Sequence, residues 1–328
     1  MTANVTEYRD RASTIRWKLV EVKREAVPAP AAALHCLLHS TILFPGMGVT
    51  PLRAAIRPPL VDGLFYPARR EALAAQIDEL LAGSATPRAA GLAVISPHAG
   101  YEYAGAVMAA AYRSIADRQV RTAVLIGPVH RDPSDSIFLP ESAAFNTPLG
   151  PVPVDAEAVS ALASSDPLYR RDDIPHLEEH CLELQLPFLA RMFPGVSIVP
   201  ILVGAVGRSA AETLSRTLLS TFGPRADSTV FVVTANMASY MTGHDTEKEN
   251  AAMEELLSRC DWKGVLSASE NHRISACGAA CIAGVLSMAG EGCRVRILAR
   301  ARSQERDEDA SRAVHYAAVS VEAARVPA

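Results

Sequence analysis

The sequence lacks the features that mark membrane, secreted and nucleotide-binding proteins. No apolar run reaches the roughly 18 residues that a membrane-spanning helix needs, so we expect no membrane partner. The first 25 residues carry scattered charges and no apolar segment of the kind found in signal peptides. No internal repeat is present, and the glycines at 204 and 207 have neither the spacing nor the lysine of a phosphate-binding loop.

Cysteine is present, but its spacing does not indicate cross-linking. The six cysteines form no CxxC pair and no disulfide framework, and a chain of 328 residues can bury a full hydrophobic core without staples. A reduced, cytoplasmic compartment is therefore the simplest interpretation. The net charge of −4 gives no reason to expect nucleic acid as a partner.

The regular part of the chain is predicted to begin near residue 50. Residues 1–50 contain a candidate charged helix over 14–27, followed by a linker composition at Pro28-Ala29-Pro30. We interpret residues 1–50 as a disordered or extraneous N-terminal extension. Residues 51–325 are predicted to form a single domain.

Apolar runs typical of strands alternate with helical patterns through that domain. The predicted strands are residues 92–96, 122–127, 196–203, 229–234, 295–299 and 315–321. The predicted helices are residues 69–81, 104–116, 155–163, 209–222, 246–257 and 275–288, with a charged turn at 176 becoming a helix that runs to about 192. This alternation predicts an α/β fold, with a mixed, mostly parallel sheet and helices on both of its faces.

Two histidines stand just past the ends of predicted strands. His98 follows 92–96 after a proline that ends the strand, and His130 follows 122–127. Ligands bind outside the carboxyl ends of strands in open α/β sheets, and the two imidazoles would converge there if their strands pair. Cys277 stands at the predicted start of a helix, where the helix dipole favours thiolate. Two imidazoles and one thiolate predict a catalytic transition-metal site; the alternative is two loop histidines and a buried core cysteine.

Glu179 and His180 form a second candidate pair. Either side chain could serve as an acid or base, or could orient a metal ligand. The alternative is a capped helix start, because Glu178 and Glu179 favour a helix N-terminus through their charge.

Several motifs, in this order, resemble the Memo family. They are Pro97-His98-Ala99-Gly100-Tyr101, Gly127-Pro128-x-His130, Glu179-His180-x-Leu182-Glu183 and Cys277-Gly278. Bacterial and archaeal members are the B proteins of the AmmeMemoRadiSam system. The resemblance implies a fold similar to class III extradiol (LigB-like) dioxygenases and a non-haem metal site at His98, His130 and Cys277. It implies a divalent transition metal, iron first, with copper or zinc as alternatives. It also implies radical-SAM and AMMECR-type partners.

One stretch departs from the family pattern. Where the family resembles Ser-Ser-Asp-Phe-x-His-Tyr, this chain reads Thr-Ala-Asn-Met-Ala-Ser-Tyr over 234–240. Asn236 cannot act as a base as the aspartate could, and Ser239 cannot replace an imidazole. His244 either substitutes in part or is a surface residue. Asn236 and Tyr101, both within these motifs, join Glu179 and His180 as candidate catalytic residues.

The leading prediction for function is metal-dependent redox or dioxygenase-type chemistry on an unknown small molecule or peptide. One alternative is a catalytically inactive module that binds a peptide or small molecule in the same crevice, as implied by animal relatives described as adaptors for phosphotyrosine peptides. Another is a zinc hydrolase that uses Glu179 as its base.

Overall fold

The computed structural model describes residues 4–7, 18–21, 55–89, 91–131, 134–204, 207–239, 245–303 and 313–324. The chain divides into two compact units, residues 1–52 and 53–328. In the first unit, β1 (Asn4–Glu7) pairs antiparallel with β2 (Lys18–Glu21), so the helix predicted over 14–27 is wrong at residues 18–21. The other residues of the proposed extension lie outside the described ones, and their disorder stays a prediction.

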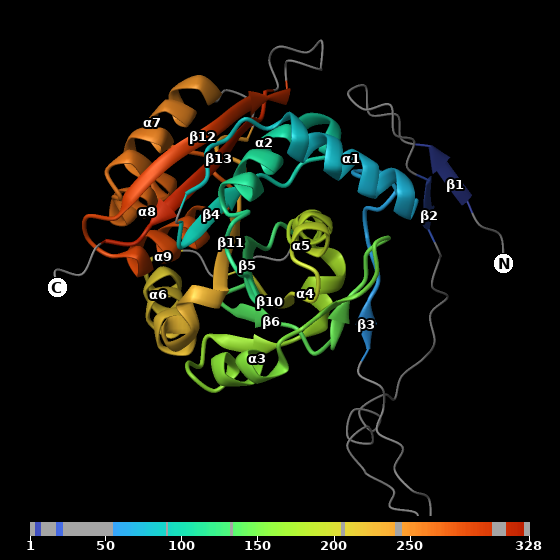
Figure 1. Ribbon diagram of the computed structural model, residues 1–328, viewed down its shortest axis with the longest axis horizontal. Helices are drawn as coiled ribbons and strands as arrows, with labels where there is room; N and C mark the ends of the chain where they lie inside the picture. Colours follow the sequence, from blue (N-terminus) through green and yellow to red (C-terminus); the bar gives the residue numbers. More distant parts are fainter. Residues whose placement is uncertain are drawn as a thin grey trace, which may run out of the picture. The chain divides into compact units, whose positions relative to one another are not determined.

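The second unit is built on a mixed sheet in which four neighbouring strands are parallel (Figure 1). Among the described residues the strand order is β12 (Arg294–Arg302), β13 (His315–Glu322), β4 (Ala93–Ser96), β11 (Thr229–Thr234), β5 (Thr122–Pro128), β10 (Ser197–Val203), β6 (Ile137–Leu139) and β9 (Tyr169–Arg171). Strands β4, β11, β5 and β10 run parallel, while β13 and β6 pair antiparallel with β4 and β10 at either side of them. A small separate sheet joins β3 (Ile56–Arg57), β7 (Ala144–Phe145) and β8 (Val152–Pro153).

Helices cover both faces of the main sheet, as predicted. Alternate residues of one strand enter different hydrophobic clusters: Ile95 belongs to one and Val94 to the other, because successive side chains of a strand point to opposite faces. The Val94 face is covered by α1 (Arg70–Gly83), α2 (Tyr101–Ser114) and α5 (Leu186–Met192). The Ile95 face is covered by α3 (Ala156–Ala163), α6 (Arg208–Phe222), α7 (Thr246–Ser258), α8 (Trp262–Glu270) and α9 (Ala279–Ala289).

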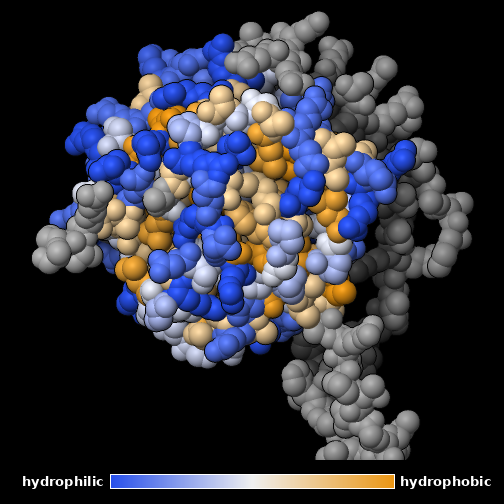
Figure 2. Space-filling view, in the orientation of Figure 1, coloured by the Kyte–Doolittle hydropathy of each residue, from blue (hydrophilic) through white to orange (hydrophobic). Residues whose placement is uncertain are grey.

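Three of the helices on the Ile95 face begin at a short acidic side chain. The Asp155 side chain accepts a hydrogen bond from the backbone of α3, as predicted, and Asp245 and Asp261 cap α7 and α8 in the same way. The sequence prediction missed α8. In Figure 2 hydrophilic side chains cover most of the visible face, with apolar ones among them near its centre.

The helix predicted to run to about residue 192 is wrong in its first half. The chain forms α4 (Asp173–Glu178), an extended residue at Glu179, a 3-10 helix (Glu183–Gln185), and only then α5. The Glu179 carboxylate accepts hydrogen bonds from the backbone N–H groups of His180 and Cys181, at 2.8 and 2.9 Å, and so competes with helix formation there.

The expectation of no disulfide is also wrong. Cys260 and Cys293 form a disulfide across 33 residues, joining the end of α7 to the turn before β12. Cys281 is a buried core residue, as predicted, and Cys181 is buried and free. In the described part of the chain, every helix is too short or too polar to cross a membrane.

Candidate metal centre

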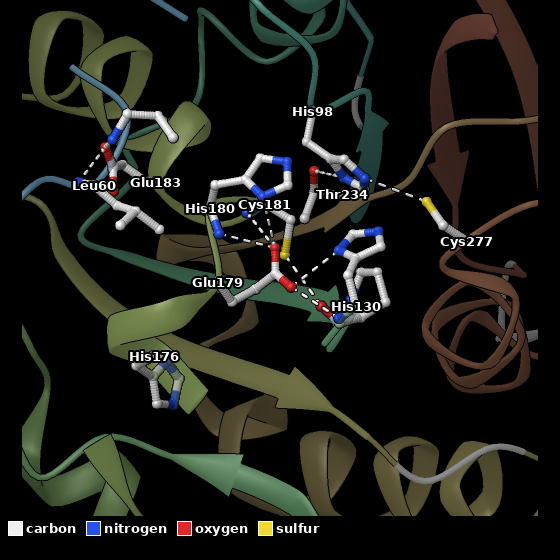
Figure 3. A network of polar contacts seen from close by, with 12 residues as sticks. Leu60, His98, His130, His176, Glu179, His180, Cys181, Glu183, Thr234 and Cys277 are labelled. Carbon is white, nitrogen blue, oxygen red and sulfur yellow. Dashed lines mark hydrogen bonds and ion pairs between the residues drawn. The ribbon is translucent and has the colours of Figure 1, made fainter. Parts of the chain in front are cut away.

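The strands that carry His98 and His130 are not neighbours, so the pairing on which the sequence prediction was conditional does not occur. Strand β11 lies between β4 and β5 and is parallel to both. The two loops nevertheless leave the sheet at the same edge, and the imidazole rings meet edge to face with their centroids 5.2 Å apart (Figure 3). The end of β11 supplies Thr234 and Asn236 to the same place.

His98 is buried and is fixed by the end of β11. Its Nδ1 lies 2.9 Å from the hydroxyl oxygen of Thr234, and its backbone N–H donates to Oδ1 of Asn236 at 3.2 Å. The Gln185 amide donates to the same Thr234 hydroxyl at 3.1 Å and to the Pro97 carbonyl at 2.9 Å. These contacts leave Nε2 of His98 facing the sulfur of Cys277, 3.3 Å away.

His130 is fixed by the buried carboxylate of Glu179. One carboxylate oxygen lies 3.0 Å from Nδ1 of His130 and also accepts the His130 backbone N–H at 2.9 Å. The other oxygen lies 3.1 Å from Nδ1 of His180. Burial raises the pKa of Glu179, but the hydrogen bonds from both imidazoles outweigh it and hold this pKa well below its usual range. Glu179 is therefore a fixed negative charge that orients two rings.

Cys277 is held against the end of β11. Its sulfur accepts the backbone N–H of Asn236 at 3.3 Å. A Cβ on the next residue, Gly278, would lie 2.8 Å from Cβ of Ala235, so a glycine is needed for this close approach. The prediction that α9 starts at Cys277 is wrong, because Gly278 is the N-cap and the helix begins at Ala279.

The charges in the cluster favour thiolate. Burial raises the pKa of the Cys277 thiol, but the charge of His98 and the hydrogen bonds from His130 and His98 outweigh it and lower the pKa to about 5. Burial conversely lowers the pKa of His130, while hydrogen bonds to Cys277 and Glu179 raise it to about 10. The metal-free cluster thus holds an imidazolium beside a thiolate, and the thiolate is the form of cysteine that binds metals.

The donor atoms of His98, His130 and Cys277 all lie within 4.8 Å of one another, so the group could hold a metal ion. Each Nδ1 atom is already occupied by Thr234 or Glu179, an arrangement typical of metal-ligating histidines. A second group, His130, Glu179 and His180, meets the same distance limit. Its carboxylate accepts three backbone N–H groups as well as both rings, so we assign it to orientation rather than to a second ion.

Sequence comparison places the chain among known proteins. A family model described as Memo-like protein matches residues 57–320. The chain belongs to the Memo-like family. It is 32% identical to a MEMO1 family protein of Aeropyrum pernix over 280 residues, which are 81% of this chain and 99% of that one. It is 31% identical to a MEMO1 family protein of Thermotoga neapolitana, over 80% of this chain and 98% of that one.

The predicted resemblance to the Memo family is thus confirmed.

A solved structure of an uncharacterized protein from Escherichia coli K12 superposes with a TM-score of 0.47 at 10% identity, covering 69% of this chain and 98% of that one. A likeness this low has no bearing on function. The predicted likeness to class III extradiol dioxygenases stays a prediction.

The residues of the stretch that departs from the family pattern are not among the three candidate ligands. Asn236 touches the cluster through its amide oxygen, which accepts from the His98 backbone, so it orients the loop. Ser239 donates its backbone N–H to the Ser275 hydroxyl at 3.0 Å, and His244 lies outside the described residues.

Tyr101 is not brought to the cluster. Its buried hydroxyl donates to the Leu184 carbonyl at 2.8 Å, and its ring packs against Tyr66 and Phe188. Burial raises the pKa of Tyr101 well above its usual value, which disfavours a role in proton transfer. Its place in the motif is accounted for by packing of α2.

The sequence prediction missed a buried ion pair that supports Glu179. Arg57 donates to Glu183 at 2.6 Å, to the Glu179 carbonyl at 2.9 Å and to the His176 carbonyl at 2.6 Å, and both side chains of the pair are almost fully buried. Glu183 also accepts from the hydroxyl of Tyr66 at 2.7 Å. Arg57 and Glu183 are 126 residues apart, and no local pattern links them.

Proposed function

We propose that this protein binds a divalent transition metal through His98, His130 and Cys277 and carries out redox chemistry of the dioxygenase type on a small molecule. The observation that supports the proposal is the convergence of two imidazoles and a thiolate. Thr234 and Glu179 already bind the Nδ1 atoms of the two imidazoles, so the Nε2 atoms are left for the metal. Iron is the first expectation; copper and zinc also accept imidazole and thiolate ligands. Three protein donors leave positions open, as catalytic sites require.

When bound, a redox-active metal would hold dioxygen and the substrate at those open positions and pass electrons from the substrate to dioxygen. The chain itself contributes orientation and proton transfer. Glu179 holds Nδ1 of His180, which leaves Nε2 of that ring as a proton acceptor; the side chain is 30% exposed, so a substrate can reach it. Phe65 packs edge-on against the His180 ring, 5.4 Å between centroids, and limits its rotation.

Metal analysis of protein purified without oxygen tests the proposal. The wild type should carry near-stoichiometric metal, and a His98→Ala, His130→Ala double variant, which keeps one of the three candidate ligands, should carry almost none. His272→Ala, at an exposed histidine, is the matched control and should retain the metal. Equal metal content in the wild type and the double variant would exclude the proposal.

A binding module remains the second candidate because of Asn236. Its amide cannot act as a base, and its oxygen is already bonded to the His98 backbone, so the crevice could bind a peptide or small molecule without turnover. Restoring the family residues with Asn236→Asp and Ser239→His separates the two. Oxygen consumption that appears only in the restored protein would favour the binding module.

The zinc-hydrolase alternative is disfavoured by the state of Glu179. Two imidazoles and three backbone N–H groups already bind its carboxylate, and its pKa lies well below the range of a useful base. Hydrolysis of ester or amide panels that is lost in Glu179→Gln would reverse this judgement.

A further inference from the structure

A cavity of about 290 Å³ lies beside the ligand cluster, between the ends of β5 and β10 and the helices α8 and α9. Cys277 lines it, and so does Val129, the residue before His130. Two of the three loops that supply donor atoms, those of His130 and Cys277, therefore form part of its wall. A larger cavity of about 790 Å³ lies around Gly91 and Glu322, and no residue of the cluster lines it.

The cavity has an apolar inner wall and a polar rim. Leu266, Ala276 and Ala279 line it and are almost fully buried, so this wall belongs to the hydrophobic core and is fixed by packing. Glu270 and His272 also line it and are exposed, so the polar groups lie where the cavity meets solvent. A ligand would therefore place an apolar body inside and a hydrogen-bonding group at the rim.

The volume limits the size of the ligand. An engineered apolar cavity of about 150 Å³ binds benzene, and drug-sized ligands occupy about 300 to 1,000 Å³. The present cavity therefore has room for one ring with short substituents. A peptide of several residues would not fit.

We propose that this cavity binds a small, mainly apolar molecule about the size of one substituted six-membered ring, with a hydroxyl or similar polar group near Glu270 and His272. That the molecule is the substrate rests on the proposed function, because Cys277 belongs both to the cavity wall and to the ligand cluster. Binding itself depends on the cavity alone and should occur with or without metal.

Benzyl alcohol is a suitable probe, titrated into metal-free and metal-loaded protein and followed by methyl NMR. We expect saturable shifts at the methyl groups of Leu266 and Ala276 and none at Ile77, which lies in the cluster on the other face of the sheet. Ala280→Phe should fill the cavity and abolish these shifts. Ala75→Phe, at an exposed position on α1, should leave them unchanged.

Ala280→Val adds less volume and is used if the phenylalanine variant fails to fold. It should lower the affinity for benzyl alcohol without changing the metal content. Unchanged binding in a folded Ala280→Phe or Ala280→Val protein would overturn the proposal, as would shifts that do not saturate in the wild type. Metal content is measured on the same samples. A wild type that takes up metal but does not bind the probe would refute the cavity and leave the proposed function standing. A wild type that binds the probe but takes up no metal would support the cavity and refute the proposed function.

Discussion

At the scale of single residues, the three candidate metal ligands depend on neighbouring residues that are not themselves among those ligands. Thr234 and Glu179 occupy the Nδ1 atoms of His98 and His130, which determines the ring nitrogen that faces Cys277. Space around these partners is tight. A Cβ on Gly127 would lie 2.6 Å from the sulfur of Cys181 and 2.7 Å from Cγ2 of Thr234.

Gly127→Ala should therefore destabilise the protein by about 1–3 kcal/mol, because neither neighbour can move without disturbing the core. Urea unfolding of the metal-free protein measures the effect. Gly83→Ala, at the end of α1 where a Cβ would meet nothing within 4 Å, is the matched control and should change stability little. Equal stability of the two variants would contradict the packing described at Gly127.

His176 gives a prediction for pH. Burial, and then the charge of Arg57, lower its pKa to about 3, against the opposing effects of Asp173 and Glu179. The folded state therefore prefers the neutral ring, and this stability is complete above the unfolded pKa near 6.5 and is lost as the pH falls towards 3. Between pH 7 and pH 5 the loss should be about 2 kcal/mol.

His176→Gln should remove that part of the pH dependence. The free energy of unfolding is measured in urea for both metal-free proteins at pH 7 and pH 5. All other titrating groups are shared, so the difference between the two slopes reports His176. Identical slopes would show that the ring does not titrate as described.

At the scale of elements, the pair of Arg57 and Glu183 joins β3 and the segment after it to α4 and the 3-10 helix. Glu183 accepts the backbone N–H groups of Leu60 and Val61 at 2.8–3.0 Å, and Arg57 holds two carbonyls around Glu179. This ion pair therefore fixes the position of the segment after β3 and of the backbone at Glu179, which orients the two imidazoles.

Arg57→Met or Glu183→Gln should each cost about 3–5 kcal/mol, because the remaining partner is left buried and unpaired. Arg191→Met removes an ion pair with Asp78 of similar geometry, 2.8 Å, but about half exposed. It should cost under about 1 kcal/mol. Unfolding by urea compares the three, and costs of equal size would contradict the role given to burial.

The disulfide of Cys260 and Cys293 belongs to the same scale, since it joins two turns. Closing a loop of 33 residues should stabilise the fold by about 4 kcal/mol in the chain-entropy account. A reductant should lower the thermal midpoint of the wild type and should have no effect on a Cys260→Ser, Cys293→Ser double variant. The same response to reductant in both proteins would rule out this disulfide as its cause.

At the scale of the whole molecule, the sequence predicts those strands and helices that are marked by a continuous pattern of several residues. The central strands and most helices were predicted, because apolar runs and the Asp155 cap are local signals. Strands β3, β6, β7, β8 and β9 were missed, because two or three residues carry no periodicity. The position of β11 between β4 and β5 could not be predicted, since strand pairing is decided by contacts far apart in the chain.

The candidate site divides in the same way. The rule that ligands bind at the carboxyl ends of strands is sufficient to select His98 and His130. Their partners Thr234 and Glu179 are 136 and 49 residues distant, and only the fold brings them close. Tyr101 shows the converse, because it belongs to a specific motif but its side chain packs against Phe188 and bonds to the Leu184 carbonyl, away from the cluster.

The separation of 179 residues between His98 and Cys277 has a consequence for biosynthesis. At a typical translation rate of about 5–20 residues per second, His98 is added to the chain about 10 to 40 s before Cys277. During that interval the thiolate ligand is missing. A nascent chain that ends before Cys277 would offer a metal ion only two imidazoles and would bind it more weakly. Binding of a metal by all three side chains would therefore have to wait until Cys277 has been added to the chain.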